Sequence, residues 1–214
     1  WHVRADGSVL TLTHVVRVVQ TRSAADRLGE LRVPGGARLL VARTLKPDGV
    51  ELWPEHVEGK PDLSFSGLQP GDAMEWAYVT RGAVRPEEGG YLGGLSFGTW
   101  DFPTLDKQVT VRTPGGLTLE PRLHGGAPAP QVTSLDDGSL LSSWRATDLP
   151  AVGREPGSVN ARAFFPMVDL VVRDVNGSTT DTDTTGTPDA PIWDAITDWY
   201  TSQLARLTAP GPRV

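Results

Sequence analysis

Hydrophobic and polar residues alternate along most of this chain with a period of two, which is typical of strands that bury one face. In segment 8–19, the side chains of Leu10, Leu12, Val16 and Val18 share one face, so we expect a central strand. The same pattern predicts strands over 38–45, 50–57, 73–80, 95–101, 105–113, 131–135, 140–147 and 164–173. Roughly ten or more strands with short connections and no helices between them predict an all-β fold, an antiparallel β-sandwich with one C-terminal α-helix.

Turn residues separate these strands. Lys46–Gly49 reads Lys-Pro-Asp-Gly, where proline presets φ and glycine supplies the positive φ of a tight turn, so this stretch predicts the clearest hairpin. A second turn over 69–72 precedes a strand that places Met74, Trp76 and Tyr78 on one bulky face. We expect this face, and Trp144 in a later strand, to lie in the core.

Composition divides the chain into three parts. Residues 1–174 form the predicted sandwich domain, and the Gly-, Ala- and Pro-rich stretch 124–130 predicts a loop or a joint between two subdomains. Residues 175–190 have almost no apolar side chain to bury, so we expect a mobile loop. Residues 191–207 predict an amphipathic helix, whose apolar stripe has spacings of three and four: Ile192, Ile196, Trp199, Tyr200, Leu204 and Leu207. This stripe either docks on the sandwich or opens a domain that follows.

Charge and composition exclude several classes of function. The 214 residues carry a net charge of -6 with the basic residues scattered singly, which argues against a nucleic-acid partner. No apolar run approaches the ~18 residues that cross a bilayer, so no membrane span is predicted. The absence of cysteine excludes disulfides, thiolate metal sites and a cysteine nucleophile. Since the chain begins at Trp1 without a leader, we expect a piece of a longer protein.

One pattern matches a serine nucleophile elbow. Gly94–Gly98 reads G-x-S-x-G around Ser96, and Asp101, Asp106 and His124 follow in the order of an α/β-hydrolase triad. The elbow requires a helix after the serine, whereas residues 99–111 alternate like a strand. A serine hydrolase that uses Ser96 is therefore only the second alternative function.

Other candidate sites are weaker, and we predict neither a cofactor nor a metal. Asp181–Gly186 resembles the opening of a calcium loop but lacks half of the expected oxygen ligands, so we expect a solvated loop. The histidines have no metal-binding spacing and are expected at surface or edge positions: His2, His14, His56 and His124. Trp53 and Trp100 are weak binding candidates, because aromatic rings stack on sugar faces. A glycan- or peptide-binding module is the first alternative function.

Several stretches together resemble a known family of domains. They resemble a bacterial domain of unknown function that is found immediately before transglutaminase-like, papain-type domains in multidomain proteins. The stretches that carry the resemblance are Asp6–Ser8, Gly29–Pro34, Ala42–Gly49, Leu68–Trp76, Phe164–Pro166 and Ile192–Tyr200. The resemblance implies a β-sandwich without activity of its own, whose neighbour supplies the Cys, His and Asp of a catalytic triad. No catalytic role passes to a residue of this chain.

The expected function is therefore that of a non-catalytic accessory domain. It would brace or regulate a downstream transglutaminase-like or cysteine-peptidase-like domain of the same polypeptide, its expected partner, and the parent protein would be a transglutaminase-like enzyme. Interdomain contacts are expected from the C-terminal helix at Trp193, Ile196, Trp199, Tyr200 and Leu204. We expect a bacterial protein of the periplasm or cell surface.

Overall fold

The computed structural model of the chain describes residues 1–55, 62–85, 90–153 and 165–174. Residues Trp1–Thr179 form one compact unit, and Thr180–Val214 form a second unit that lies outside the described residues. In the described part, strands joined by short turns dominate, and the one helix is short. None of the described helical structure is long and apolar enough to cross a membrane.

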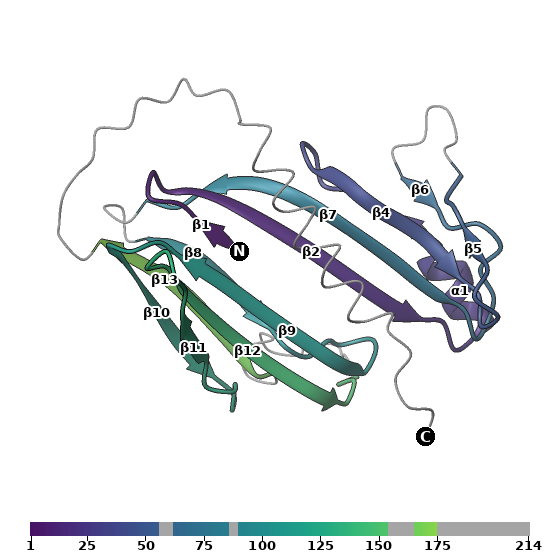
Figure 1. Ribbon diagram of the computed structural model, residues 1–214. Helices are drawn as coiled ribbons and strands as arrows, with labels where there is room; N and C mark the ends of the chain where they lie inside the picture. Colours follow the sequence, from purple (N-terminus) through teal and green to yellow (C-terminus); the bar gives the residue numbers. More distant parts are fainter. Residues whose placement is uncertain (56–61, 86–89, 154–164, 175–214) are drawn as a thin grey trace. The chain divides into compact units, whose positions relative to one another are not determined.

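Most strands belong to one large sheet of eight, in the order β11-β12-β9-β1-β2-β7-β4-β5 (Figure 1). A small sheet has the order β10-β13-β8, and β3 pairs with β6. Neighbouring strands are antiparallel except β1 and β9, which are parallel. The bounds are β1 His2–Val3, β2 Ser8–Val18, α1 Arg22–Leu28, β3 Glu30–Leu31, β4 Arg38–Leu45, β5 Glu51–Leu52, β6 Leu63–Ser64, β7 Ala73–Ala83, β8 Tyr91–Ser96, β9 Thr104–Thr113, β10 Leu117–His124, β11 Gln131–Ser134, β12 Leu140–Leu149 and β13 Met167–Asp174.

The first of two apolar cores lies between the large and the small sheet. The large sheet contributes Val9, Val111 and Trp144, and the small sheet contributes Val168 and Leu170 from its middle strand β13. All five side chains are almost completely buried, as expected for two sheets that share a layer of alternating side chains. We call this side of the large sheet its inner side, and the opposite side its outer side.

The second core also lies on the inner side, at the β2, β7 and β4 strands. Met74 and Trp76 of β7 pack there with Val19, with Ala25 of α1 and with Phe65, which follows β6. The short helix and the β3–β6 pair thus complete the inner side where the small sheet does not supply the cover.

The predicted all-β sandwich is confirmed, and so is much of its detail. Strands β2, β4, β7, β9, β11, β12 and β13 coincide with predicted strands to within a few residues. Met74, Trp76 and Trp144 are buried as predicted, and Tyr78 is partly buried against the second core. The bulky face of β7 and the core position of Trp144 are therefore predicted correctly from alternation.

The predicted hairpin forms between β4 and β5. The Lys46 amide donates to the Val50 carbonyl at 2.8 Å, and Gly49 has a φ of 87°. Lys46 Nζ also donates to Asp72 Oδ2 at 2.7 Å, which ties this turn to the turn before β7. The return strand is shorter than the predicted 50–57, since β5 ends at Leu52 and residues 56–61 lie outside the described part.

The shared apolar face predicted for β2 points to the outer side of the large sheet. Val9 and Val15 contact the cores, so the odd-numbered residues point inward. The face with Leu10, Leu12, Val16 and Val18 is therefore the outer one, on which Leu10 is 7% exposed whereas Val16 and Val18 are 54% and 53% exposed. The position of the strand is as predicted, because β2 lies inside the large sheet between β1 and β7.

Helix α1 contradicts the expectation that no helix lies between the strands. Thr21 caps its start by accepting a hydrogen bond from the Ala24 amide at 3.1 Å, and the Gly29 amide donates to the Ala25 carbonyl at its end. At seven residues, the helix is too short to show a 3.6-residue periodicity.

Two strands of the small sheet also differ from the prediction. β10 was not predicted, because Pro121 interrupts its alternation; the proline is tolerated since β10 is a terminal strand. β8 ends at Ser96 rather than continuing over 95–101, because the chain turns at Gly98, against which the Phe165 ring packs. The stretch 124–130, predicted as a loop or joint, holds the turn and irregular segment between β10 and β11. The predicted loop 175–190 and helix 191–207 lie outside the described residues.

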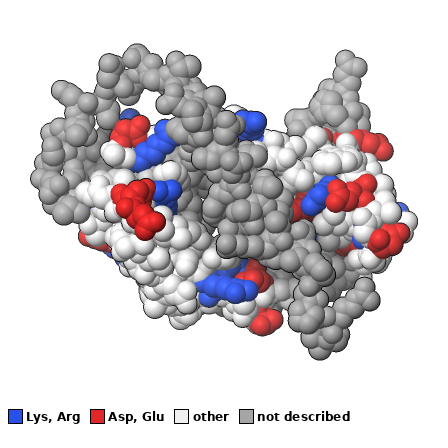
Figure 2. Space-filling model, in the orientation of Figure 1, with Lys and Arg blue, Asp and Glu red and all other residues white. Residues whose placement is uncertain are grey.

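Charged side chains of both signs are interspersed on the described surface that Figure 2 shows. Arg145 of β12, for example, forms a bidentate ion pair with Asp106 of β9, and the shorter of its two hydrogen bonds is 2.7 Å long. Neighbouring opposite charges of this kind largely cancel the field that a polyanion would meet.

Candidate functional site

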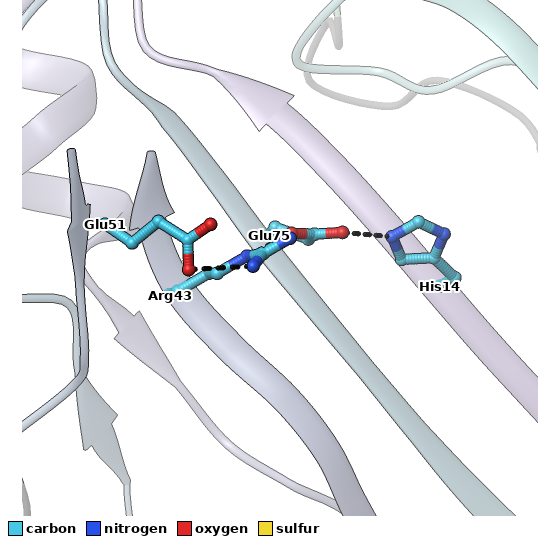
Figure 3. Close-up of polar contacts among 4 residues, drawn as sticks. All are labelled: His14, Arg43, Glu51 and Glu75. Carbon is cyan, nitrogen blue, oxygen red and sulfur yellow. Dashed lines mark hydrogen bonds and ion pairs between the residues drawn. The ribbon is translucent and has the colours of Figure 1, made fainter. Parts of the chain in front are cut away.

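Three charged side chains and a histidine form a connected network on the outer side of the large sheet (Figure 3). Glu75 of β7 is at its centre: Arg43 Nε donates to Glu75 Oε2 at 2.6 Å, and His14 Nε2 lies 2.9 Å from Glu75 Oε1. Arg43 Nη1 also donates to Glu51 Oε2 at 2.9 Å. Because an ionised carboxylate only accepts, the His14 Nε2 carries the hydrogen of that bond. We call these four residues the charge network.

Strand register brings the network together. Arg43 of β4 lies directly opposite Glu75 of β7, and Val16 of β2 lies opposite Glu75 on its other flank. His14 is two residues from Val16, so its ring reaches Glu75 as a diagonal neighbour on the same side of the sheet. The network therefore depends on the register of β2, β7 and β4 for its buried centre, and on the pairing of β5 with β4 for Glu51.

Burial makes the central carboxylate dependent on its partners. The Glu75 side chain is 3% exposed and that of Arg43 is 16% exposed, whereas Glu51 is 43% exposed. A buried charge is costly unless it is paired and hydrogen-bonded, and both Glu75 oxygens are bonded here. The network thus passes from a buried centre to an exposed carboxylate at the sheet edge.

The ionisation of the network follows from these contacts. The hydrogen bond from His14, and after it the one from Arg43, hold the pKa of Glu75 below its ordinary 4.5, although burial acts in the opposite direction. Burial alone would lower the pKa of Arg43, but its bonds to Glu75 and Glu51 outweigh burial and raise it. Glu75 and Arg43 therefore stay ionised together.

Exposed apolar residues adjoin the network. Val18 lies opposite Ala73, Ala73 opposite Leu45, and Leu45 opposite Glu51, so these residues form one row across four strands. Val16 belongs to the next row, beside Glu75. We call Val16, Val18 and Glu51 the outer patch. A fixed surface that combines exposed apolar groups with a held charge is typical of a protein contact.

The structure does not assemble the serine triad considered from the sequence. Ser96 and His124 lie on the two strands that flank β13, each opposite Met167, so the middle strand keeps their Cα atoms about 10 Å apart. Ser96 Oγ donates to the Gly98 carbonyl at 2.8 Å. Residues 97–103 form turns that lead into β9, so the helix that an elbow requires does not follow Ser96.

The acidic residues of that pattern have other partners. Asp106 pairs with Arg145 in the large sheet, and the charge of Asp101 acts on Arg17. His124 instead pairs with Asp169 of β13, whose Oδ2 lies 2.9 Å from Nε2. Tyr91 OH donates to the other oxygen of Asp169 at 3.2 Å, so this carboxylate is held from both flanking strands.

The two tryptophan candidates have different surroundings. Trp53 directly follows β5 and is 63% exposed, so its ring is open to a ligand. The Trp100 ring packs edge-on against Phe165 at 4.8 Å between centroids and is partly buried. Glycan binding by Trp53 and Trp100 stays a prediction.

The remaining candidates lie partly outside the described residues. This applies to the proposed interdomain contacts Trp193, Ile196, Trp199, Tyr200 and Leu204, to His56 and to Asp181–Gly186. Within the described ranges, no group of three or more His, Asp or Glu side chains could hold a metal ion.

Sequence reasoning missed the charge network. The prediction that the histidines lie at surface or edge positions is wrong for His14, which lies on an inner strand with its side chain 20% exposed. Arg43 and Glu75 did carry a signal, since each is a charged residue next to apolar residues within its strand: Arg43 follows Val41 and Ala42, and Glu75 lies between Met74 and Trp76. Pairing them required the register between β4 and β7.

Comparison with known proteins gives a likeness at the level of the fold. No family model matches the sequence, and no curated protein matches it. Among solved structures, the chain is similar to the crystal structure of a "putative protease" from Parabacteroides distasonis ATCC 8503, with a TM-score of 0.60 and 20% identity. The match covers 80% of this chain and 38% of that chain, so the chain spans well under half the length of this neighbour. At this identity the likeness shows the fold alone.

Proposed function

We propose that this chain is a non-catalytic accessory β-sandwich domain that braces a downstream transglutaminase-like or cysteine-peptidase-like domain of the same polypeptide. The observation that carries the proposal is the outer patch, where two half-exposed valines of β2 share one side of an ordered sheet with a held carboxylate on the terminal strand β5. Such a surface suits contact with a folded neighbour better than contact with a small substrate, because its buried charges are already satisfied.

The fold likeness supports the same proposal. The similar solved structure is much longer than the matched region, and its name is that of a "putative protease". A sandwich that occupies a minor part of such a chain leaves the chemistry to the remainder. The family resemblance of the sequence assigns that remainder to a domain with a Cys, His and Asp triad, and this chain has no cysteine to supply the nucleophile.

The proposal predicts that charges in the outer patch separate the two domains. In the longer parent polypeptide, we expect Val16→Glu combined with Val18→Glu to lower the melting temperature of the catalytic domain by about 4 °C, because carboxylates at a contact must be desolvated. Differential scanning calorimetry measures the shift. Circular dichroism of the double variant of this chain alone checks that the sandwich still folds.

Leu105→Glu is the matched control. Leu105 is 67% exposed on β9, so the substitution adds a charge at an equally accessible apolar position outside the outer patch. We expect this variant to unfold like the unchanged parent. Equal shifts for Leu105→Glu and the double variant, or no shift for either, would show that the outer patch is not the contact.

A further inference from the structure

Within the described part of the chain, the strand β11 is an edge of the large sheet without protective features. All four of its residues, Gln131–Ser134, are exposed, and none is charged or a proline. It pairs with β12 on one side and is the last strand of the sheet on the other. An exposed edge strand is a template for another strand unless charge, proline, a bulge or shortness protects it.

The other terminal strands of the two larger described sheets carry such protection. β5 is only two residues long and includes Glu51. β10 contains Pro121 between Glu120 and Arg122, and the pairing of β8 with β13 is interrupted by a bulge. Strand β11 therefore differs from the other three terminal strands, because it contains none of these protective features.

The backbone groups that β11 offers follow from its ladder. The Leu135 amide donates to the Ser139 carbonyl at 2.9 Å, so in this antiparallel pair the alternate residues Thr133 and Gln131 also bond inward to β12. Val132 and Ser134 consequently point their N–H and C=O groups away from the sheet. The edge therefore offers two N–H donors and two C=O acceptors at the spacing of an extended chain.

Each of the two larger sheets has an apolar, incompletely covered side chain on its terminal strand. Val132 lies opposite Ser142, on the same inner side as the buried Trp144, yet it is 58% exposed. Leu123 of β10 lies opposite the fully buried Val168 of the small sheet, and it is 42% exposed. Both sheets thus end on a core-facing apolar side chain that an added strand could cover.

We propose that β11 binds an extended peptide segment that adds an antiparallel strand to the large sheet, with apolar side chains at alternate positions facing the inner side. The backbone of Val132 and Ser134 supplies the hydrogen bonds, and the Val132 side chain supplies an apolar neighbour. This site is separate from the outer patch, and the inference does not depend on the proposed accessory function.

A second copy of this chain fits the edge less well than such a peptide does. In the antiparallel pair of two β11 strands that bonds all of their outward N–H and C=O groups, Val132 lies opposite Ser134. The register that instead opposes the two Val132 residues places Ser134 opposite Pro130, which has no N–H to donate. In the first register a hydroxyl would face the exposed valine, whereas a peptide can place an apolar residue there. Apolar cross-strand pairs are the more favourable ones.

The test uses the heptapeptide Lys-Thr-Val-Thr-Val-Thr-Lys as the probe for the full chain. Titration followed by NMR is expected to shift and protect the amides of Val132 and Ser134. The same peptide N-methylated at its valines should not bind, because the valine N–H groups face β11 in the proposed register. N-methylation at the threonines should leave binding intact, since those groups face away.

Two substitutions at Ser134 distinguish the contribution of its backbone N–H to peptide binding from that of its side chain. Ser134→Pro removes one outward donor and should weaken binding about tenfold, whereas Ser134→Ala keeps that donor and should bind like the unchanged chain. Equal binding by the two methylated peptides, or no shift at β11 at the highest soluble peptide concentration, would overturn the proposal. Dimerisation of the chain that Ser134→Pro abolishes would also overturn it, by assigning the edge to a second copy.

Discussion

Glu75→Ala is expected to lower the free energy of unfolding of this chain by about 3 kcal/mol. The substitution leaves the Arg43 guanidinium, which is 16% exposed, without its 2.6 Å partner, and it leaves a cavity beside the His14 ring. Removing one member of a buried ion pair is costly because the other charge stays buried, and the exposed Glu51 compensates Arg43 only in part. Urea denaturation followed by circular dichroism measures the change.

Glu51→Ala is the matched control for this loss. Glu51 bonds to the same guanidinium at 2.9 Å, but its side chain is 43% exposed. Exposed pairs contribute little, so we expect a loss below about 1 kcal/mol. If the Glu51 and Glu75 variants lost the same stability, the buried centre of the charge network would not be what holds the three strands in register.

The dependence of the free energy of unfolding on pH in acid gives an independent test of the same carboxylate. The pKa of Glu75 is lower in the folded chain than the ordinary 4.5, so its contribution is fully present above pH 4.5 and is lost as the pH falls through the folded value. Glu75→Gln removes this titration. We expect the stability of the Gln variant to fall less steeply below pH 4.5 than that of the unchanged chain. An equally steep fall in stability for the two chains below pH 4.5 would contradict the lowered pKa of Glu75.

Gly125→Ala is expected to cost about 3 kcal/mol. Gly125 has a φ of 59°, and an added Cβ would lie 2.5 Å from the Phe165 carbonyl oxygen, a backbone atom that cannot rotate away. Phe165 is 3% exposed, so the displaced chain has no free space to enter. The variant therefore combines a strained backbone with a collision in the packed interior.

Gly126→Ala separates these two causes. Gly126 has a φ of 76°, and an added Cβ would meet nothing within 4 Å. The neighbouring variant carries the backbone cost alone, which is about 1 kcal/mol. The two variants are compared by urea denaturation under the same conditions. Equal losses would show that the close approach of Phe165 to Gly125 does not contribute to stability.

Alternation was sufficient to predict the strands that form the body of the sandwich, because a sheet with one buried face imposes that period on the sequence. It placed Trp76 and Trp144 in the core. It did not identify β10, where Pro121 breaks the pattern, or α1, whose seven residues complete barely two turns. Both elements are specified by packing against neighbours that are distant in the sequence.

The charge network could not be predicted from the sequence, for a related reason. His14 and Glu75 are 61 residues apart, and Arg43 and Glu75 are 32 apart, so only the strand register brings them together. The opposite error occurred at Ser96, where a local pattern suggested chemistry.

The glycines around Ser96 have packing roles instead. A Cβ at Gly94 would lie 2.5 Å from Asp169 Oδ1, and a Cβ at Gly98 would lie 2.5 Å from the Phe165 ring. The G-x-S-x-G pattern is thus explained by close contacts with β13 and the residue that leads into it.

The central claim is that this chain supports chemistry carried out by another domain. The most direct measurement is acyl transfer from a glutamine-containing peptide to hydroxylamine, assayed for this chain alone and for the longer parent polypeptide at equal concentration. The account predicts hydroxamate formation by the parent polypeptide and none above background by this chain. Turnover by this chain alone at the rate of the parent polypeptide would contradict it.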